Sequence, residues 1–282
     1  MFRKILYTDS GASHIQEMLK VLLELPSIKQ ANITILHAVP PQVSAEGFAA
    51  KWEEGSKSIN QILKDVVIDP SKVSTVLRQG DPKQVVCDVA EEIHADLIII
   101  GSRGLKRLEA ILENSVSQYV FQLSTRPMLL VKDDIYIKKI KKVMVAIDKS
   151  PASLYALDLA LNLLRGQTGV EIYLVRVNPD LKADIVLSRS EMEENPILGP
   201  AFSKVKQMGF TGKAIVTGGR PGEQICKLAE DNQIDLLFLG SPDRRPSIAK
   251  SLPDLDRLLG TSLSDYVRVN ALCPVLLARQ EG

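Results

Sequence analysis

The chain has 282 residues, enough for two ordinary domains, and its 45% hydrophobic and 24% charged residues are typical of globular proteins. A formal net charge of +1 gives no electrostatic reason to expect nucleic acid or an anionic membrane surface as a partner. Because no apolar run approaches a membrane span and the N-terminus lacks an apolar signal core, we expect a cytoplasmic protein with no membrane partner.

Short apolar runs alternate with segments of helical periodicity through the first half of the chain. The runs predict strands at Lys4–Tyr7, Ala31–His37, Lys72–Leu77, Leu97–Ile100 and Pro127–Val131. Helices are expected from Ser13, over Ala49–Val67, from Asp81-Pro82 and over Ser115–Leu123. Continuously apolar strands between helices favour a doubly wound α/β domain with a five-stranded parallel sheet. Ligands of such sheets bind beyond the carboxyl ends of the strands, where Asp9, Ala38 and Gly101 lie.

The second half of the chain repeats the first. Asp81–Ser102 aligns without gaps on Arg220–Ser241, and the same offset places Asp9 on Asp148 and His37 on Arg176. Ser115–Val120 likewise matches Ser262–Val267. We therefore predict two tandem domains of one fold, 1–137 and 138–282, joined by a short charged segment.

A glycine turn is predicted after the strand Leu97–Ile100. Gly101 and Gly104 bracket this turn, and Asn114 and Ser115 follow at the start of the next helix. Free N–H groups and the helix dipole at such a place favour phosphate binding. A glycine after a strand is also commonly an ordinary turn, so the spacing of the whole motif matters more than either glycine.

The pattern Gly101-x2-Gly104-x9-Asn114-Ser115 resembles the ATP-binding signature of the universal stress protein family. The segments KILYTDS and LLVK also resemble the first and last strands of that family. The resemblance covers nearly the whole chain twice and implies the adenine-nucleotide alpha-hydrolase-like fold. It implies a site for ATP or AMP, with Mg²⁺ carried by the nucleotide and held through Asp9. The first-domain residues that it assigns to this site are Thr8, Asp9, Ser10, Ala38, Gly101, Arg103, Gly104, Asn114, Ser115, Val116 and Ser117.

The second copy departs from the motif. Asp243 stands where the first copy has Gly104, and the loop before Ser262 is longer, with an insertion at 241–260. Because a carboxylate repels phosphate, we expect this copy to be degenerate for a triphosphate or altered in what it binds. Its candidate residues are Asp148, Val177, Gly240 and Ser262. The segment Asn178–Pro200 carries few structural signals and suggests a flap or an interaction surface.

Other candidate residues have plain structural explanations. Asp9 also suits a helix cap, and Arg103 also suits a solvated loop position. The three histidines show no metal-ligand spacing, and Cys87 and Cys226 lie in apolar helical patterns that favour buried, reduced thiols. No Walker A, GxGxxG or GxSxG motif is present.

Three functions remain open on the sequence. The first is a stress-response regulatory protein that binds adenine nucleotide mainly in the first domain, with no catalytic residues. The second is a slow ATP hydrolase or phosphotransferase, in which Asp9 would hold the metal. The third is an interaction scaffold that binds no nucleotide. The family pairs subunits through the last strand, which implies that the two domains form an intrachain pseudo-dimer, with an unknown protein partner and further homodimerisation left open.

Overall fold

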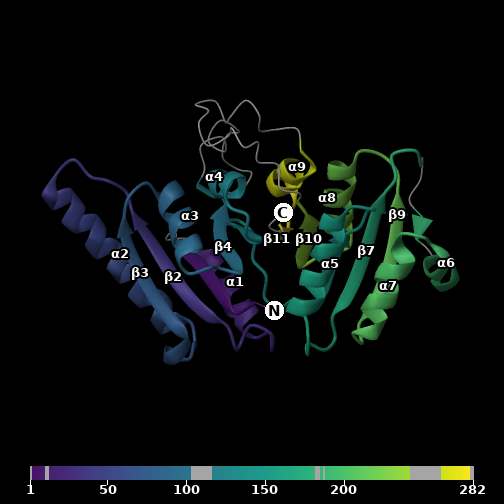
Figure 1. The fold of residues 1–282 in the computed structure, drawn as a ribbon, viewed down its shortest axis with the longest axis horizontal. Helices are drawn as coiled ribbons and strands as arrows, with labels where there is room; N and C mark the ends of the chain where they lie inside the picture. The colour runs from purple at the N-terminus through teal and green to yellow at the C-terminus, as the bar shows by residue number, and fades with distance from the viewer. Residues whose placement is uncertain are drawn as a thin grey trace. The chain divides into compact units, whose positions relative to one another are not determined.

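The computed structural model describes residues 2–9, 13–102, 116–181, 185–186, 188–241 and 262–279. The predictions for Ser10, Arg103, Gly104, Asn114, Ser115 and Asp243 therefore lie outside the described residues. The chain divides into two compact units at Lys138, and each is described here by itself (Figure 1).

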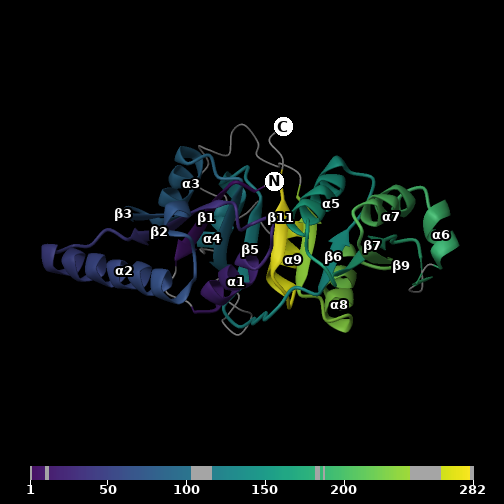
Figure 2. The same cartoon turned by 90° about the horizontal axis from the view of Figure 1, so that it is seen from below.

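The first domain is a parallel five-stranded sheet with helices on both faces. Its elements are β1 (Lys4–Asp9), α1 (Ser13–Leu23), β2 (Asn32–Val39), α2 (Ala45–Asp65), a 3₁₀ turn (Pro70–Lys72), β3 (Val73–Gln79), α3 (Pro82–Glu92), β4 (Leu97–Ser102), α4 (Val116–Leu123) and β5 (Met128–Lys132). The strand order is β3-β2-β1-β4-β5, and every neighbouring pair is parallel. Helices α1 and α2 cover one face and α3 and α4 the other (Figure 2).

The second domain repeats this arrangement. Its elements are β6 (Lys142–Ala146), α5 (Pro151–Leu163), β7 (Glu171–Val177), β8 (Ile185–Val186), α6 (Arg189–Glu194), α7 (Leu198–Gln207), β9 (Thr211–Thr217), α8 (Pro221–Asp231), β10 (Leu236–Gly240), α9 (Leu263–Asn270) and β11 (Val275–Ala278). The order is β11-β10-β6-β7-β9-β8, in which the first five strands are parallel and β8 is antiparallel to β9. The predicted doubly wound α/β fold is confirmed, with one short added strand.

The central strands and their helices follow from burial and capping. β1, β2 and β4 are apolar and almost completely buried in their middles, as a sheet covered on both faces requires. Asp81 caps α3 by accepting a hydrogen bond from the Lys83 N–H at 3.0 Å, and Pro82 occupies the first turn. This confirms the helix start that the Asp-Pro pair predicts.

Several predicted boundaries are wrong, and three of them concern a candidate residue or a helix start. β4 continues through Gly101 to Ser102, because these residues pair with Val131 and Lys132 of β5. Gly101 therefore lies within the strand, next to its last residue, and does not begin a turn. α2 starts earlier than the apolar pattern indicates, because Ser44 caps it by accepting from the Gly47 N–H. Ala38 lies within β2 and not after it.

The segment Asn178–Pro200 contains regular structure that its sequence did not signal. β8 and α6 lie within it, and Asn195 accepts hydrogen bonds from the N–H groups of Ile197 and Leu198 at the start of α7. The two-residue length of β8 explains why no strand pattern could be read.

Two aspartates anchor the first strand of each domain in the same way. Asp96 accepts hydrogen bonds from the backbone N–H groups of Arg3 and Lys4 at 2.7 and 2.9 Å. Asp235 does the same for Lys141 and Lys142, both at 2.8 Å. Each carboxylate thus satisfies two donors that begin an inner strand.

We expect Asp96→Ala to destabilise the first domain by about 1.5 kcal/mol, the lower end for hydrogen bonds to a charged group, because the site is partly open to water. Hydrogen exchange followed by mass spectrometry should show faster exchange at the start of β1. Asp134→Ala, at an exposed position, is the matched control. Equal exchange in the two variants would contradict the anchoring role.

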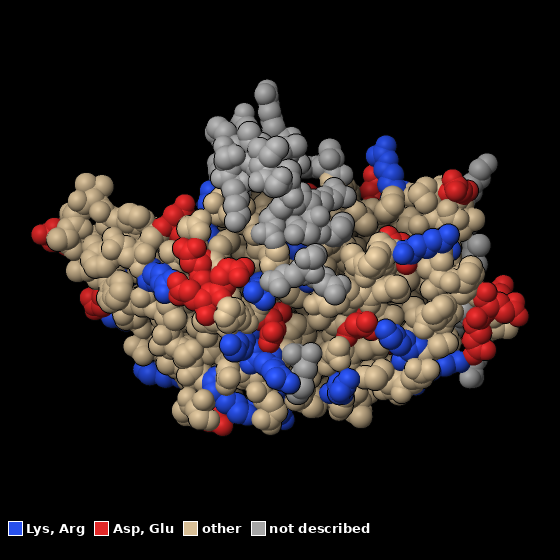
Figure 3. Space-filling model, in the orientation of Figure 1, with Lys and Arg blue, Asp and Glu red and all other residues tan. Residues whose placement is uncertain are grey.

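The described residues also bear on the predictions about membrane spans, cysteines and surface charge. In the part of the chain that the structure describes, no helix is long and apolar enough to cross a membrane. The sequence predicted buried thiols, whereas Cys87 and Cys226 are only half-buried. Partial burial nevertheless raises the pKa of the Cys87 thiol to about 12. On the face shown in Figure 3, basic and acidic side chains are interspersed with uncharged surface.

Candidate functional site

A cleft opens in the second domain at the carboxyl ends of the parallel strands. It lies where the strand order reverses, with β6 followed by β7 on one side and β10 on the other. This switch point is where doubly wound sheets bind ligands. The lining residues are Ala146, Ile147, Asp148, Ser150, Ser153, Val175, Val177, Pro221, Ile225, Leu239, Gly240 and Leu263.

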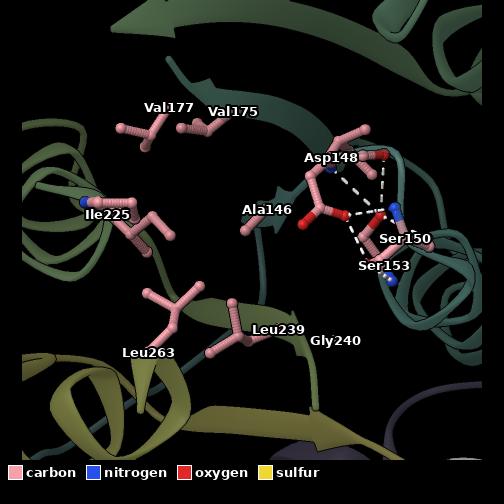
Figure 4. A pocket seen from close by; sticks show the side chains of 12 residues that line it. Ala146, Asp148, Ser150, Ser153, Val175, Val177, Ile225, Leu239, Gly240 and Leu263 are labelled. Atoms are coloured by element: carbon pink, nitrogen blue, oxygen red, sulfur yellow. Dashed lines mark hydrogen bonds between the residues drawn. The ribbon is translucent and has the colours of Figure 1, made fainter. Parts of the chain in front are cut away.

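Most of the cleft wall is apolar. Val175 and Val177 end β7, Ile225 belongs to α8, and Leu263 begins α9 (Figure 4). The cavity measures about 120 Å³ and reaches about 500 Å³ when the open space at its mouth is included. An apolar slot with a few polar groups at one side is the usual form of a small-molecule site.

The polar side of the cleft is built by Asp148, Ser150 and Ser153. Ser150 donates to Asp148 Oδ1 from its backbone N–H, at 2.8 Å, and from its hydroxyl. The Ser153 hydroxyl accepts from the Asp148 N–H and donates to the carbonyl oxygens of Asp148 and Ser150. Burial raises the pKa of Asp148, but these hydrogen bonds outweigh it and hold the pKa below its ordinary value. The cleft therefore has a fixed, ionised carboxylate at its edge.

Gly240 allows the floor of the cleft to form. A Cβ at this position would lie 2.5 to 2.6 Å from backbone atoms of Ala152 and Ser153 in the first turn of α5. The glycine is thus required by the approach of a helix backbone to a strand end. Ser262, also predicted for this site, caps α9 by accepting from the Asp265 N–H at 3.1 Å, next to the lining residue Leu263.

The corresponding place in the first domain has different polar contacts. The carboxylate of Asp9, only 4% exposed, lies 2.8 Å from Nδ1 of His37 at the end of β2. The far side of the imidazole faces Gly55 of α2, where a Cβ would lie 2.5 Å from Cδ2 and 2.9 Å from Nε2. Burial, with Asp9 nearby, raises the pKa of Tyr7 on β1. The Asp9 carboxylate is thus bound to a histidine, whereas Asp148 is exposed at a cleft.

The other predicted residues of the first domain occupy varied positions. The Thr8 hydroxyl donates to the Ile99 carbonyl oxygen at 3.2 Å inside the sheet. Ala38, Gly101 and Val116 are half-buried, and Ser117 is buried in the first turn of α4. Of the described candidates, the structure brings Asp9 into contact with His37, a residue that the sequence interpretation treated as structural.

Several lining residues of the second-domain cleft were missed. Ser150 and Ser153 follow Asp148 in the segment DKSPAS, where an Asp-x-Ser pattern before a proline signals a capped helix start. Ile225 and Leu263 had no signal, because each belongs to an ordinary helical apolar pattern and only the fold carries it to the cleft.

Candidate metal ligands were compared over the part of the chain that the structure describes. Among the residues described, no three His, Cys, Asp or Glu side chains form a group that could hold a metal ion.

Comparisons with known proteins agree with the repeated fold. The family model described as the universal stress protein family matches residues 1–132 and again 139–279. The chain is 29% identical over 148 residues to universal stress protein YxiE of Bacillus subtilis, covering 47% of this chain and 100% of that protein. It is 27% identical over 135 residues to universal stress protein Sll1654 of Synechocystis, covering 46% of this chain and 86% of that protein.

A solved structure spans both halves. The crystal structure of a universal stress protein from Archaeoglobus fulgidus matches with a TM-score of 0.74 and 20% identity, covering 98% of this chain and 96% of that one. That likeness supports the fold. Because the family model covers nearly all of both domains, the chain belongs to the universal stress protein family and contains two copies of its domain.

Proposed function

We propose that this protein is a regulatory protein that binds adenine nucleotide, ATP or AMP, at the switch points of its sheets. The observation that carries the proposal is the second-domain cleft. Its residues Ile147, Asp148, Val177, Gly240 and Leu263 are the repeat counterparts of Thr8, Asp9, Ala38, Gly101 and Val116, which the sequence motif assigns to nucleotide in the first domain.

The chemistry of the cleft suits a nucleoside. An apolar slot between Val177, Ile225 and Leu263 would accept the flat face of a purine. The Asp148 carboxylate at its edge would accept hydrogen bonds from ribose hydroxyl groups, as acidic residues do in other doubly wound sheets. Phosphates would extend toward the N-terminus of α9. Mg²⁺ would join only through these phosphates, because it keeps most of its water and binds few protein ligands.

The two domains are proposed to differ in the nucleotide that they prefer. The first-domain motif, with Gly101, Gly104 and Ser115, supports ATP there. In the second domain, Asp243 replaces the second glycine, which disfavours a triphosphate and leaves AMP as the better ligand. The preference for the first domain remains a prediction.

Nucleotide binding is proposed to regulate an unknown protein partner and not to support turnover. A ligand shifts a conformational equilibrium only by its difference in affinity for the two states, so the partner surface must change on binding. Pairing of the last strands of the two domains as an intrachain pseudo-dimer is part of this proposal, since the repeat supplies two like domains.

We expect Val177→Phe to lower the affinity of the second domain for AMP at least tenfold, because the ring fills the slot from its half-buried rim. Val177→Ala keeps the slot open and is the matched control. Isothermal titration of the full chain with AMP should show the loss of one site in the Phe variant alone. AMP binding that is equal in wild type and both variants would contradict a site in this cleft.

A protein that binds no adenine nucleotide in either domain would be a separate outcome. If the purified protein carries no adenine nucleotide and binds neither added AMP nor added ATP, the regulatory proposal fails and the scaffold alternative takes its place. Mass spectrometry of small molecules released by denaturation gives this result without assuming which nucleotide is bound.

A further inference from the structure

The outer strand of the first domain differs from its counterpart in the second. β3 is the last strand of its sheet, and among the described residues no strand lies on its outer side. None of its seven residues is buried. In the second domain, the equivalent strand β9 is covered on that side by β8, in antiparallel pairing.

The strand register identifies the equivalent positions. His37 and its counterpart Arg176 have Leu77 and Val216 as partners on the outer strands. Leu77 and Val76 therefore correspond to Val216 and Ile215, the residues that β8 pairs with. Val216 is 7% and Ile215 is 5% exposed, whereas Val76 and Leu77 are only half-buried. Among the described residues of the first domain, no strand covers the aliphatic pair whose counterpart in the second domain is covered by β8.

Backbone groups of β3 point outward at the same positions. In the second domain, the Asn178 N–H donates to the Thr217 carbonyl oxygen, so Thr217 faces β7 and Val216 faces β8. In the first domain, the Gly80 N–H donates to the Val39 carbonyl oxygen of β2. Because bonding directions alternate along a strand, Thr75 and Leu77 turn their N–H and C=O groups outward.

β3 also lacks the features that keep edge strands apart. Its sequence VSTVLRQ contains no proline and no lysine, and it is rich in β-branched residues. Its one charge, Arg78, is held by both carboxylate oxygens of Glu92 at 2.7 Å. Nothing on the strand itself opposes pairing with another strand.

We propose that β3 is a homodimerisation edge, which pairs antiparallel with β3 of a second copy of this chain about a two-fold axis at Val76. In this register Val76 faces Val76 of the second copy, Thr75 faces Leu77, and Arg78 faces Ser74. The outward pairs Thr75 and Leu77 exchange hydrogen bonds, and no charge meets its like. A second copy is the occupant because antiparallel pairing of identical strands is self-complementary, and closes the assembly as a dimer. This interface joins copies of the chain and is independent of nucleotide binding.

The first test removes an outward donor. Thr75→Pro deletes the N–H that the second copy would use, and edge strands tolerate proline where that group faces solvent. Thr75→Val keeps the N–H and is the matched control. Analytical ultracentrifugation of the full chain over a range of concentrations should show a dimer for wild type and Thr75→Val, and at least a tenfold weaker dimer for Thr75→Pro.

The second test keeps the backbone intact. Val76→Cys places two thiols opposite each other at the axis, where the Cα atoms of a non-hydrogen-bonded pair lie about 4.5 Å apart, within the range for a disulfide. Mild oxidation should give a covalent dimer, absent when wild type, with Cys87, Cys226 and Cys273, is treated alike. A wild-type chain that is monomeric throughout, a dimer unchanged by Thr75→Pro, or no cross-link at position 76 would each overturn the proposal.

Discussion

Gly240→Ala is expected to destabilise the second domain by about 3 kcal/mol, the upper part of the usual range for overpacking. The new Cβ would lie 2.5 Å from the Ala152 carbonyl carbon and 2.6 Å from the Ser153 nitrogen. These are backbone atoms, so no side-chain rotation can relieve the contact. α5 would have to move away from β10 as a unit.

Such a movement is costly because the start of α5 is fixed. Ser150 caps the helix by accepting from the Ser153 N–H, and the Ser153 hydroxyl bonds back to Asp148 and Ser150. Displacing the first turn therefore breaks these bonds or strains the segment between β6 and α5, which contains Asp148. The same change would distort the polar side of the cleft.

Hydrogen exchange resolved by peptide is the suitable measurement, because a two-domain chain need not unfold in one step. Peptides from α5 and β10 should lose protection, while those from the first domain should not. Gly209→Ala is the control: its φ is +81° but nothing lies within 4 Å of the new Cβ, so only a backbone cost of about 1–2 kcal/mol is expected. Equal losses in the two variants would refute the packing explanation.

The role of Gly240 changes how its counterpart Gly101 should be tested. The sequence motif assigns Gly101 to a phosphate turn. On that assignment, a larger residue at position 101 should block nucleotide binding directly. The structure instead places Gly101 within β4, paired with Val131. By the repeat, we expect a side chain at Gly101 to disturb the packing of α1 as well. Loss of nucleotide in such a variant would therefore need a folding control before it could be assigned to the site.

The fold was predictable because its signals are local and occur twice. Continuous apolar strands, the Asp-Pro helix start at Asp81-Pro82 and the gap-free repeat are all visible in sequence and match the structure. β8 was not predictable, because two residues cannot show a period.

The candidate site was only partly predictable, because distant segments build it. Asp148, Val177 and Gly240 could be named from strand ends, and they do line one cleft. Ile225 reaches that cleft from α8, where its spacing is that of any buried helical residue. The His37–Asp9 contact was missed for a similar reason. Two residues at the ends of adjacent parallel strands are neighbours in space, but the sequence does not show which strands are adjacent.

Gly55→Ala is expected to destabilise the first domain by about 2 kcal/mol, although alanine is favoured over glycine by about 1 kcal/mol inside a helix. Gly55 lies in the middle of α2, and its Cβ would meet Cδ2 of His37 at 2.5 Å and Cδ1 of Leu77 at 2.9 Å. The Leu77 methyl group can rotate, because that residue is half-buried at the sheet edge. The His37 ring cannot, because Asp9 holds its Nδ1 at 2.8 Å.

Gly55→Ala in the His37→Ala background shows whether the contact with the His37 ring determines the sign of the stability change. Without the imidazole, the only remaining close contact is with the Leu77 methyl group, which rotation relieves, so Gly55→Ala should become stabilising by about 1 kcal/mol. Hydrogen exchange of α2 peptides in the four proteins of this double-mutant cycle measures the coupling. If Gly55→Ala stabilises α2 equally in both backgrounds, the imidazole moves freely and the Asp9 contact does not hold it. A reversal of sign means that the close approach of α2 to the His37 ring requires glycine at position 55, because the Asp9 carboxylate at the end of β1 holds that ring in place.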